Sequence, residues 1–531
     1  MRLYRAFATV GGLTMLSRVF GFIRDILIAA TLGTSAVADA FFVAFRFPNL
    51  FRRLFGEGAF NAAFVPLFAK TLEGEGQAAA RRFAEEALAG LVGILLVLTI
   101  IAEIAMPFLM LGLAPGFRSD PGKYDLAVLL TRITMPYLLC MSVVALLSGV
   151  LNSVGKFVES SSVSIVLNVT MMAATLIALG MGLRNDPLAG IIQAWGVFVA
   201  GLLQLWLLLD GVRRNGLSLR LRWPRMSQGV RRLIRLGVPG VIAGGVTQLN
   251  IMIGTIVASL QDGAVSHLYY ADRIYELPLA IVGIAIGIVL LPDVARHLRA
   301  GNHAAVMDSQ NRSVEFAMLL TIPAAAALVV VPAPIVQGLF ERGAFSSADT
   351  PATAYALAIF ALGLPSFVLI KVFSPAYFAR EDTATPMRYA TLSLTLNTLG
   401  SIALFFAFRA WGLMPHLGIA VATTLGGWLN AGLLYATLVR KGHFTSDARL
   451  RRTLPRIALA SLAMSVVLWI MAALLAPVFA AGATLERSLA LLTLIGAGVA
   501  VYAVAVIVLG AVQVRQLLGL MRGGRPAADD S

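Results

Sequence analysis

Long runs of apolar residues, separated by short polar stretches, extend along the whole chain. A helix needs about 20 mostly apolar residues to cross the hydrocarbon core of a bilayer. On that basis the pattern predicts fourteen membrane-spanning helices, with boundaries loose by several residues. The expected spans are 8–31, 36–66, 86–112, 126–150, 161–182, 188–210, 236–260, 270–295, 313–338, 351–379, 386–408, 413–438, 455–478 and 487–513.

Composition supports this all-α polytopic membrane fold. The 531 residues are 59% hydrophobic and 13% charged, whereas a soluble domain is typically about 45–50% apolar. The one cysteine, Cys140, lies in an apolar run, which argues against a disulfide framework and a cysteine metal site. No P-loop or nucleophile elbow is present, so nothing indicates an ATPase or a serine hydrolase.

The net charge of +15 reflects membrane topology rather than nucleic-acid binding, because the basic residues are scattered between hydrophobic segments. Most lysines and arginines fall in alternate loops, and the positive-inside rule then places both termini in the cytoplasm. The basic and apolar N-terminus resembles a signal peptide, but Arg18 interrupts its hydrophobic region. We therefore expect a retained first helix.

An internal repeat divides the first twelve spans into two halves. Six spans is an even number, so the two halves share one orientation, which is a transporter architecture with substrate at the repeat interface. Four collinear matches support the repeat at an offset of 228 or 229 residues: ATLGTSAV at 30–37 with ASLQDGAV at 258–265, SIVLN at 164–168 with SLTLN at 393–397, Pro136 with Pro365, and Gly190-Ile191 with Gly418-Ile419.

The repeat predicts two parallel six-helix lobes. Residues 1–210 form the N-terminal lobe and 236–440 the C-terminal lobe. Between them, 211–235 is a basic amphipathic linker, interpreted as a helix on the cytoplasmic surface. Residues 441–531 add spans 13 and 14 and a cytoplasmic tail.

The second span carries charges that a lipid-exposed helix would not tolerate. It reads ADAFFVAFRFPNLFRRLFGEGAF over 38–60, and an arginine at the bilayer centre costs about 2.5–3.5 kcal/mol on insertion scales. Asp39, Arg46 and Arg53 are spaced by seven and share one helix face, whereas Arg52 points elsewhere. Pro48 should bend this helix.

Spans 1 and 8 add further charges, Arg18, Arg24 and Asp25 in the first and Asp272, Arg273 and Glu276 in the second. A central cavity lined by these spans would be cationic and would suit a diphosphate, which an arginine can bind through two hydrogen bonds. The alternative is that the arginines form structural ion pairs with Asp25, Asp39, Glu57, Asp272 and Glu276, or reach the interface.

Weaker candidates lie elsewhere in the spans. Lys371 and Arg132 could line the cavity or be structural, and Glu103 is more often structural than functional in such a position. Asn168 and Asn397 are interpreted as interhelical hydrogen-bonding residues rather than ligands of a coupling ion. The histidines lie at loops or span ends without metal-binding spacing, so neither a metal nor a cofactor is expected.

Several motifs together resemble the MurJ/MviN family of lipid II flippases, in the multidrug/oligosaccharidyl-lipid/polysaccharide exporter superfamily. They are SRVFGFIRD at 17–25, ADAFFVAFRFPNLFRRLFGEGAFNAAFVPLF at 38–68, APGF at 114–117, YYADRIYELP at 269–278 and REDTATP at 380–386. The resemblance runs through the chain in order.

The resemblance implies that lipid II, an undecaprenyl-diphosphate-linked peptidoglycan precursor, enters from the cytoplasmic leaflet and is released outside by alternating access. It implies a bacterial inner-membrane protein, not an enzyme, that serves cell-wall biogenesis and cell shape. It also implies a functional monomer, surrounded by membrane lipids, that could associate with the cell-wall synthesis machinery. The undecaprenyl tail of the transported lipid would lie along spans 13 and 14.

The same resemblance assigns roles to individual residues. Arg24, Arg52 and Arg273 match the headgroup-binding arginines, and Arg18, Asp25 and Asp39 match further charged positions that bind substrate. Portal or cavity positions are Arg46, Arg53, Glu57, Gly58, Asp272 and Glu276.

Three alternatives remain open from the residues alone. An exporter of another lipid-linked oligosaccharide could use the same cationic cavity. A cation-coupled drug exporter should have an acidic cavity instead. A membrane glycosyltransferase or lipid phosphatase would need catalytic carboxylates or histidines in a large loop, and no loop is long enough.

Overall fold

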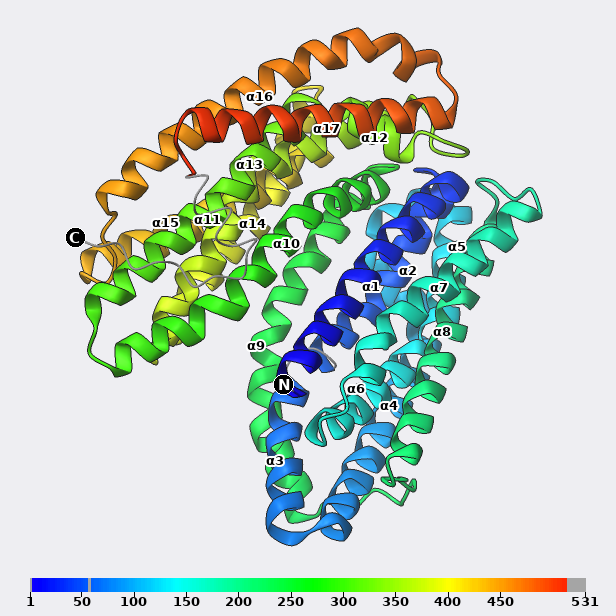
Figure 1. Cartoon of the computed structure of the whole chain (residues 1–531). Coiled ribbons are helices and arrows are strands. Elements are labelled where there is room, and N and C mark those ends of the chain that lie inside the picture. Colours follow the sequence, from blue (N-terminus) through cyan, green and yellow to red (C-terminus); the bar gives the residue numbers. More distant parts are fainter. Residues whose placement is uncertain (1, 56–58, 513–531) are drawn as a thin grey trace. The chain divides into compact units, whose positions relative to one another are not determined.

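The fold is helical throughout the part of the chain that the computed structural model describes, residues 2–55 and 59–512. Within those ranges there is no β-strand, which confirms the all-α fold class. The elements are α1 (Arg2–Leu32), α2 (Ala36–Phe55), α3 (Ala59–Glu75), α4 (Gln77–Leu113), the 3₁₀ turn η1 (Pro115–Ser119), α5 (Pro121–Thr134), α6 (Tyr137–Ser153), α7 (Val158–Gly180), α8 (Pro187–Arg214), α9 (Gln228–Ala258), α10 (Ala264–Arg299), α11 (His303–Val330), α12 (Pro332–Phe340), α13 (Thr350–Phe378), α14 (Ala384–Ala410), α15 (His416–Arg440), α16 (Ala448–Ala481) and α17 (Thr484–Val508) (Figure 1).

Ten helical segments of the described chain are long and apolar enough to cross a membrane. The bent pair α5 and α6 counts as one of these, Pro121–Ser153. The helices α1, α2, α3, α9 and α10 are not among the ten, and each of them includes residues whose side chains lie outside the described part of the structure. The total of fourteen spans therefore stays a prediction.

Two predicted spans are interrupted where the sequence places proline. The span expected at 126–150 is divided between α5 and α6 at Pro136, and that expected at 313–338 is divided between α11 and α12 at Pro332. Proline lacks an amide hydrogen and disfavours helical geometry in the residue before it. By contrast, α2 continues as a helix through Pro48.

The basic linker is not a single amphipathic helix, so that interpretation is wrong. Helix α8 extends to Arg214 and α9 begins at Gln228, while 217–227 has no regular structure. Instead, this segment is hydrogen-bonded to Glu85 of α4. Glu85 accepts hydrogen bonds from Arg81 Nε, from the Arg220 amide at 3.1 Å and from Arg222 Nε. A Cβ atom placed on Gly93 of α4 would lie 3.4 Å from Pro224 Cγ.

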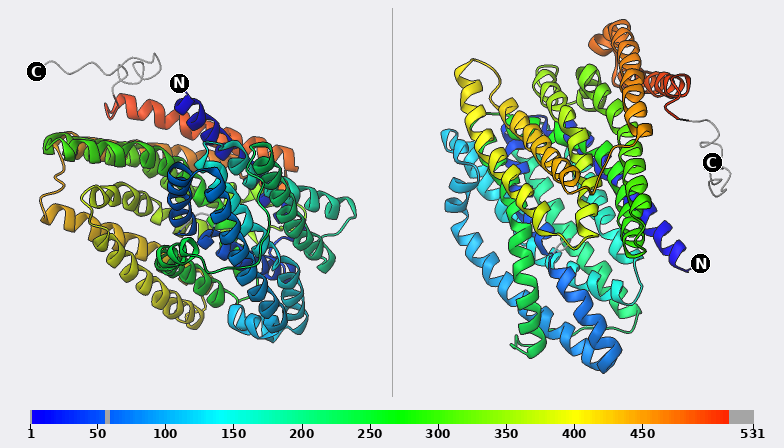
Figure 2. Two further views of the ribbon diagram at one scale, coloured as in Figure 1. Left: turned by 90° about the horizontal axis from the view of Figure 1, so that it is seen from below. Right: turned by 90° about the vertical axis from the view of Figure 1, so that its left-hand side faces the viewer.

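The described chain forms two compact units, Met1–Ser266 with Arg342–Ser346, and His267–Glu341 with Ser347–Ser531. In the first unit α1 packs on α7, α7 on α8, α2 on α5 and α9 on α3 (Figure 1). In the second unit α13 packs on α15 and α11, and α14 on α15. Helices α16 and α17 pack side by side at the edge of that unit (Figure 2).

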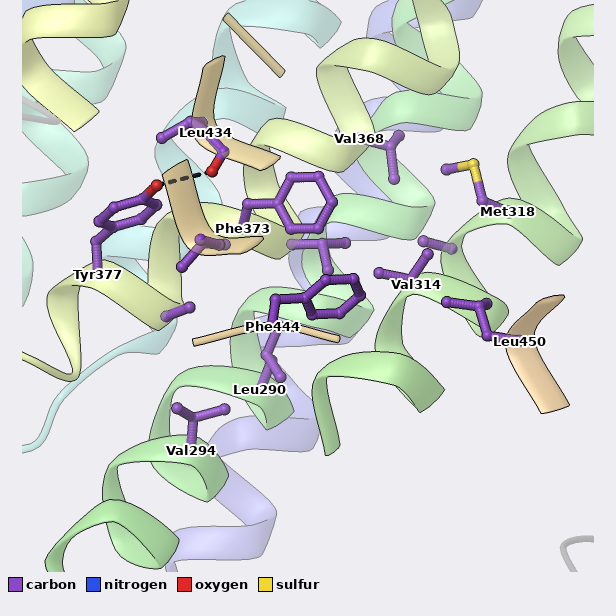
Figure 3. Packing of buried hydrophobic residues seen from close by; sticks show 14 of the residues in the cluster. Leu290, Val294, Val314, Met318, Val368, Phe373, Tyr377, Leu434, Phe444 and Leu450 are labelled. Atoms are coloured by element: carbon purple, nitrogen blue, oxygen red, sulfur yellow. Dashed lines mark hydrogen bonds between the residues drawn. The ribbon is translucent and has the colours of Figure 1, made fainter. Parts of the chain in front are cut away.

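The core of the second unit is a continuous apolar cluster contributed by α10, α11, α13 and α15, with Phe444 and Leu450 from the following loop and α16. Figure 3 shows Phe373 and Phe444 facing each other inside it. The phenol of Tyr377 donates a hydrogen bond to the Leu434 carbonyl at 2.7 Å (Figure 3). Its polar group is therefore satisfied at the edge of the core.

The element boundaries follow the sequence repeat. Helix α8 starts at Pro187 and α15 at His416, and α1 and α9 end at Leu32 and Ala258, near the same offset. However, α9 packs on α3, α4 and α2 within the first unit. The lobe boundary expected at residue 236 therefore stays a prediction.

Candidate functional site

The site begins at Arg24, in a helix of the first unit. Arg24 and Asp25 are 5% and 1% exposed. Arg24 lies eight residues before the end of α1, or about 12 Å from it at 1.5 Å per residue. Its Nε and Nη2 donate to Asp25 Oδ1 at 3.0 and 2.7 Å. Burial of a guanidinium is costly without such pairing.

A second helix also holds Arg24. Its Nη1 donates to Asn168 Oδ1 on α7 at 2.9 Å, and its guanidinium carbon lies 5.8 Å from the centre of the Phe45 ring on α2. Asn168 Nδ2 in turn donates to the Ser17 carbonyl on α1 at 2.8 Å. Asn168 is therefore an interhelical hydrogen-bonding residue, as the sequence indicated, and an arginine is one of its partners.

Asp39 lies at a different place in the first unit, fully buried near the start of α10. Its carboxylate accepts from Lys123 Nζ at 2.8 Å, from the Gly263 and Ser266 amides at 2.9 and 3.0 Å, and from Ser266 Oγ at 2.6 Å. The alternative in which Asp39 forms an ion pair with an arginine is wrong for this residue, because its cation is Lys123.

Lys123 is not among the residues expected at the site, because it falls between the expected spans 86–112 and 126–150. It is 3% exposed, and its ammonium also bonds Asp262 at 3.0 Å and lies 4.4 Å from the Phe117 ring centre. A signal was available in the sequence: Asp120 caps α5 and Pro121 opens it, a typical helix start. That start places Lys123 in the first turn.

The other predicted positions of the first unit are dispersed. Arg46 Nη1 donates to Thr255 Oγ1 on α9 at 2.5 Å, whereas Arg18 is exposed on α1. The side chains of Arg52 and Arg53 lie outside the described residues, as do Glu57 and Gly58 entirely.

The second unit has a related arrangement of its own on α10. Arg273 Nη1 donates to Glu276 Oε2 one turn later at 2.8 Å, and its guanidinium carbon lies 4.8 Å from the Tyr269 ring centre. Arg24 and Arg273 thus each have a nearby carboxylate and an aromatic ring. Asp272, beside Arg273, is half-buried.

Of the weaker candidates, Glu103 and Arg132 lie together. Arg132 Nε donates to the Glu103 main-chain carbonyl at 3.1 Å. Lys371 is exposed. Among the described residues, no three His, Cys, Asp or Glu side chains are grouped so that they could hold a metal ion.

Comparison with known proteins shows the family to which the chain is similar. The family model of the lipid II flippase MurJ matches residues 28–490. The "Probable lipid II flippase MurJ" of Rhizobium meliloti (strain 1021) is 48% identical over 504 residues, covering 94% of this chain and 93% of that protein. The protein of the same name from Rhizobium tropici is 46% identical, covering 99% and 98%.

Solved structures give the same result. The structure titled "Lipid II flippase MurJ, inward closed conformation" matches with a TM-score of 0.77 and 25% identity, covering 96% of this chain and 99% of that one. An inward-facing multidrug MATE family transporter of the MOP superfamily matches with a TM-score of 0.61 and 14% identity, covering 82% and 98%. The second likeness concerns the fold alone.

Proposed function

This chain belongs to the MurJ family of lipid II flippases, and we propose that it moves lipid II from the inner to the outer leaflet by alternating access for peptidoglycan synthesis. The proposal concerns a membrane transporter and not an enzyme. It predicts that the diphosphate of the lipid is the group that the arginines bind.

The observation that carries the proposal is the buried guanidinium of Arg24. A diphosphate is strongly hydrated, so its passage through an apolar region requires cationic groups that replace water. Arg24 is buried in α1 and oriented by fixed hydrogen bonds. A planar guanidinium can donate two parallel hydrogen bonds to phosphate oxygens.

In the proposed cycle Asp25 is the counter-ion of Arg24 when no lipid is bound. The pair then carries no net charge, which limits the cost of its burial. The incoming diphosphate would compete with the Asp25 carboxylate for the same donors. Arg24 would then have an anionic partner in both states, and release outside would restore the pair seen here.

The remaining positions complete the proposed path. Arg273 would bind the headgroup as Arg24 does, with Glu276 as its partner in the unloaded state. We assign Arg18, Asp25, Asp39 and Arg52 to substrate binding and Arg46, Arg53, Glu57, Gly58, Asp272 and Glu276 to the portal or cavity.

We also propose a bacterial inner-membrane location with both termini in the cytoplasm, supported by the concentration of basic residues in alternate loops. We propose, from the resemblance to the family, that the transporter acts as a monomer. Association with the cell-wall synthesis machinery is a further expectation from the family.

The test is the exposure of lipid II at the outer face of cells. Cells would be depleted of this protein and of any redundant flippase, then supplied with the wild-type chain or with Arg24→Ala. We expect outer-face lipid II to fall on depletion and to return only with the wild-type chain. Arg409→Ala is the matched control, because it removes the same charge from an exposed position in the last turn of α14.

Two results would contradict the proposal. Unchanged outer-face lipid II after depletion would mean that the substrate is another lipid-linked oligosaccharide. Wild-type transport by Arg24→Ala would remove Arg24 from the binding site while leaving the substrate assignment intact. Membrane insertion of each variant would be checked by its level in purified membranes.

A further inference from the structure

Asn168 has one possible amide orientation in this structure. The Ser17 carbonyl can only accept a hydrogen bond and the Arg24 guanidinium can only donate one. Asn168 must therefore present Nδ2 to Ser17 and Oδ1 to Arg24, as observed at 2.8 and 2.9 Å. The side chain is 6% exposed, so water is largely excluded from competing for these bonds.

The face of α1 that contacts Asn168 has a small residue at the point of contact. Ser17, Gly21 and Arg24 are spaced by four and three residues and share one face of the helix. A Cβ on Gly21 would lie 3.3 Å from Asn168 Nδ2, tighter than an ordinary carbon contact. The glycine therefore allows the amide to lie directly against α1, between the residue that anchors it and the arginine that it holds.

A neutral partner matters at this position. Asp25 already supplies one carboxylate to Arg24, through Nε and Nη2. A second carboxylate on α7 would leave the group with a net negative charge and repel an anionic ligand. An amide oxygen restrains Nη1 without cancelling the charge, and it reduces the rotamer freedom that a long arginine side chain would lose on binding.

We propose that Asn168 is a positioning residue for substrate binding, which orients Arg24 for the diphosphate of the transported lipid without neutralising it. The inference rests on the proposed function, because it takes Arg24 as a diphosphate-binding residue. Asn168 itself makes no contact with the lipid in this scheme. It acts through the direction and charge of the guanidinium.

The experiment measures lipid II translocation in proteoliposomes as a function of lipid II density. Asn168→Leu removes both hydrogen bonds and keeps the branching at Cγ, at a larger side-chain volume. We expect KM to rise about tenfold, as for loss of one hydrogen bond to a charged group, with kcat within about twofold. Asn168→Asp keeps the shape and adds a carboxylate, so it should raise KM at least as much.

The chain provides a matched control in Asn397 on α14, at the equivalent position of the repeat. Its Oδ1 accepts from Ser401 Oγ and Thr423 Oγ1, at 3.2 and 3.3 Å. Asn397→Leu should lower the melting temperature about as much as Asn168→Leu and leave KM unchanged. Gly21→Ala displaces the Asn168 amide without altering it, and should raise KM by a smaller factor of about three.

The outcomes separate this inference from the proposed function. If Asn168→Leu and Gly21→Ala lower the melting temperature but leave KM unchanged, Asn168 is only structural and the inference is overturned. If Asn168→Asp transports with the wild-type KM, the argument for a neutral partner is wrong. If Arg24→Ala also transports normally, the assignment of Arg24 fails first, independently of Asn168. Should Asn168→Leu not fold, Gly21→Ala provides the same test.

Discussion

At equivalent positions of the repeat, the first unit buries charges where the second unit buries neutral polar groups. Asp39 on α2 pairs with Lys123 on α5. At nearly the same repeat positions, His267 Nδ1 lies 2.9 Å from Thr353 Oγ1, between α10 and α13. The Thr353 hydroxyl also donates to the Asp349 carbonyl, so the histidine nitrogen is the donor to Thr353.

The asparagines of the repeat show the same difference. Asn168 bonds a buried arginine, whereas Asn397 accepts from two hydroxyls of α14 and α15. Neutral hydrogen bonds therefore suffice to join such helices in the second unit. A buried ion pair is rarely more stabilising than well-packed neutral groups. The charges of the first unit are thus better explained by transport than by folding.

The largest effect should come from Arg273, a charged candidate of the second unit. Arg273→Ala removes the guanidinium that lies beside Glu276 and Tyr269, and we expect translocation to fall at least 100-fold, because a headgroup contact is lost. Arg273→Lys retains the charge without the planar fork and should recover part of the rate. The measurement is the rate of lipid II translocation in proteoliposomes that contain each variant. Full activity in Arg273→Ala would confine the binding charges to the first unit.

The next effect concerns the cost of leaving a buried charge unpaired. Lys123→Met removes the cation from the fully buried Asp39, and we expect a loss of about 3–5 kcal/mol in the free energy of unfolding. Thr353→Val, its neutral counterpart, should cost about 1–2 kcal/mol. Denaturation in detergent measures both.

Adding Asp39→Asn to Lys123→Met is the control for this comparison. It removes the unpaired charge and should restore part of the stability. Equal losses of unfolding free energy for Lys123→Met and Thr353→Val would mean that the Asp39–Lys123 and His267–Thr353 contacts do not differ in their dependence on charge.

A smaller effect separates the two repeat glycines at the starts of α8 and α15. A Cβ on Gly418 would lie 2.6 Å from the main-chain carbonyl carbon of Leu404, whereas a Cβ on Gly190 would meet the Val37 Cγ1 atom at 2.8 Å. A side chain can rotate away more easily than a backbone can move. We expect Gly418→Ala to cost about 2–3 kcal/mol and Gly190→Ala about 1, measured by thermal unfolding. A larger loss of stability for Gly190→Ala than for Gly418→Ala would contradict this prediction.

The smallest effect concerns the loops before α7 and α14. At neither start does the N-cap residue, Phe157 or Thr383, bond the first turn through its side chain. Before α14, Asp382 accepts from the Thr385 amide and hydroxyl at 3.0 and 2.8 Å and from Lys441 Nζ at 3.2 Å. The Thr385 amide, the Thr385 hydroxyl and Lys441 together lower the pKa of this carboxyl below its usual value.

Because that pKa is lowered on folding, the stabilisation is present above the ordinary value of about 3.9 and is lost as pH falls through the folded value. Hydrogen exchange at the start of α14 should therefore be slower than at α7 near neutral pH, after correction for the intrinsic exchange rate. Asp382→Asn should reduce this protection at neutral pH, and acidification should then have little further effect at α14. Equal protection of the two starts in the wild type would contradict the capping role.

Much of the fold could be predicted from the apolar runs, because a bilayer requires long helices that satisfy their own backbone. The breaks at Pro136 and Pro332 were missed because adjacent apolar runs merge in a hydropathy reading. At the site, Arg24 and Arg273 stand out in sequence as charges inside apolar runs. The Arg24–Asp25 and Arg273–Glu276 pairings were foreseen as an alternative because the partners are close in sequence.

The sequence by itself determined the helical membrane class, the repeat and the candidate charges Arg24 and Arg273 within apolar runs, since each depends on local spacing and composition. Only the tertiary structure decided that Lys123 neutralises Asp39, 84 residues away, and that Asn168 holds Arg24, 144 residues away. It also decided that the linker lies as an unstructured segment along Glu85. Such partners depend on which helix faces meet, and in a chain this apolar the hydrophobic pattern does not distinguish one face from another.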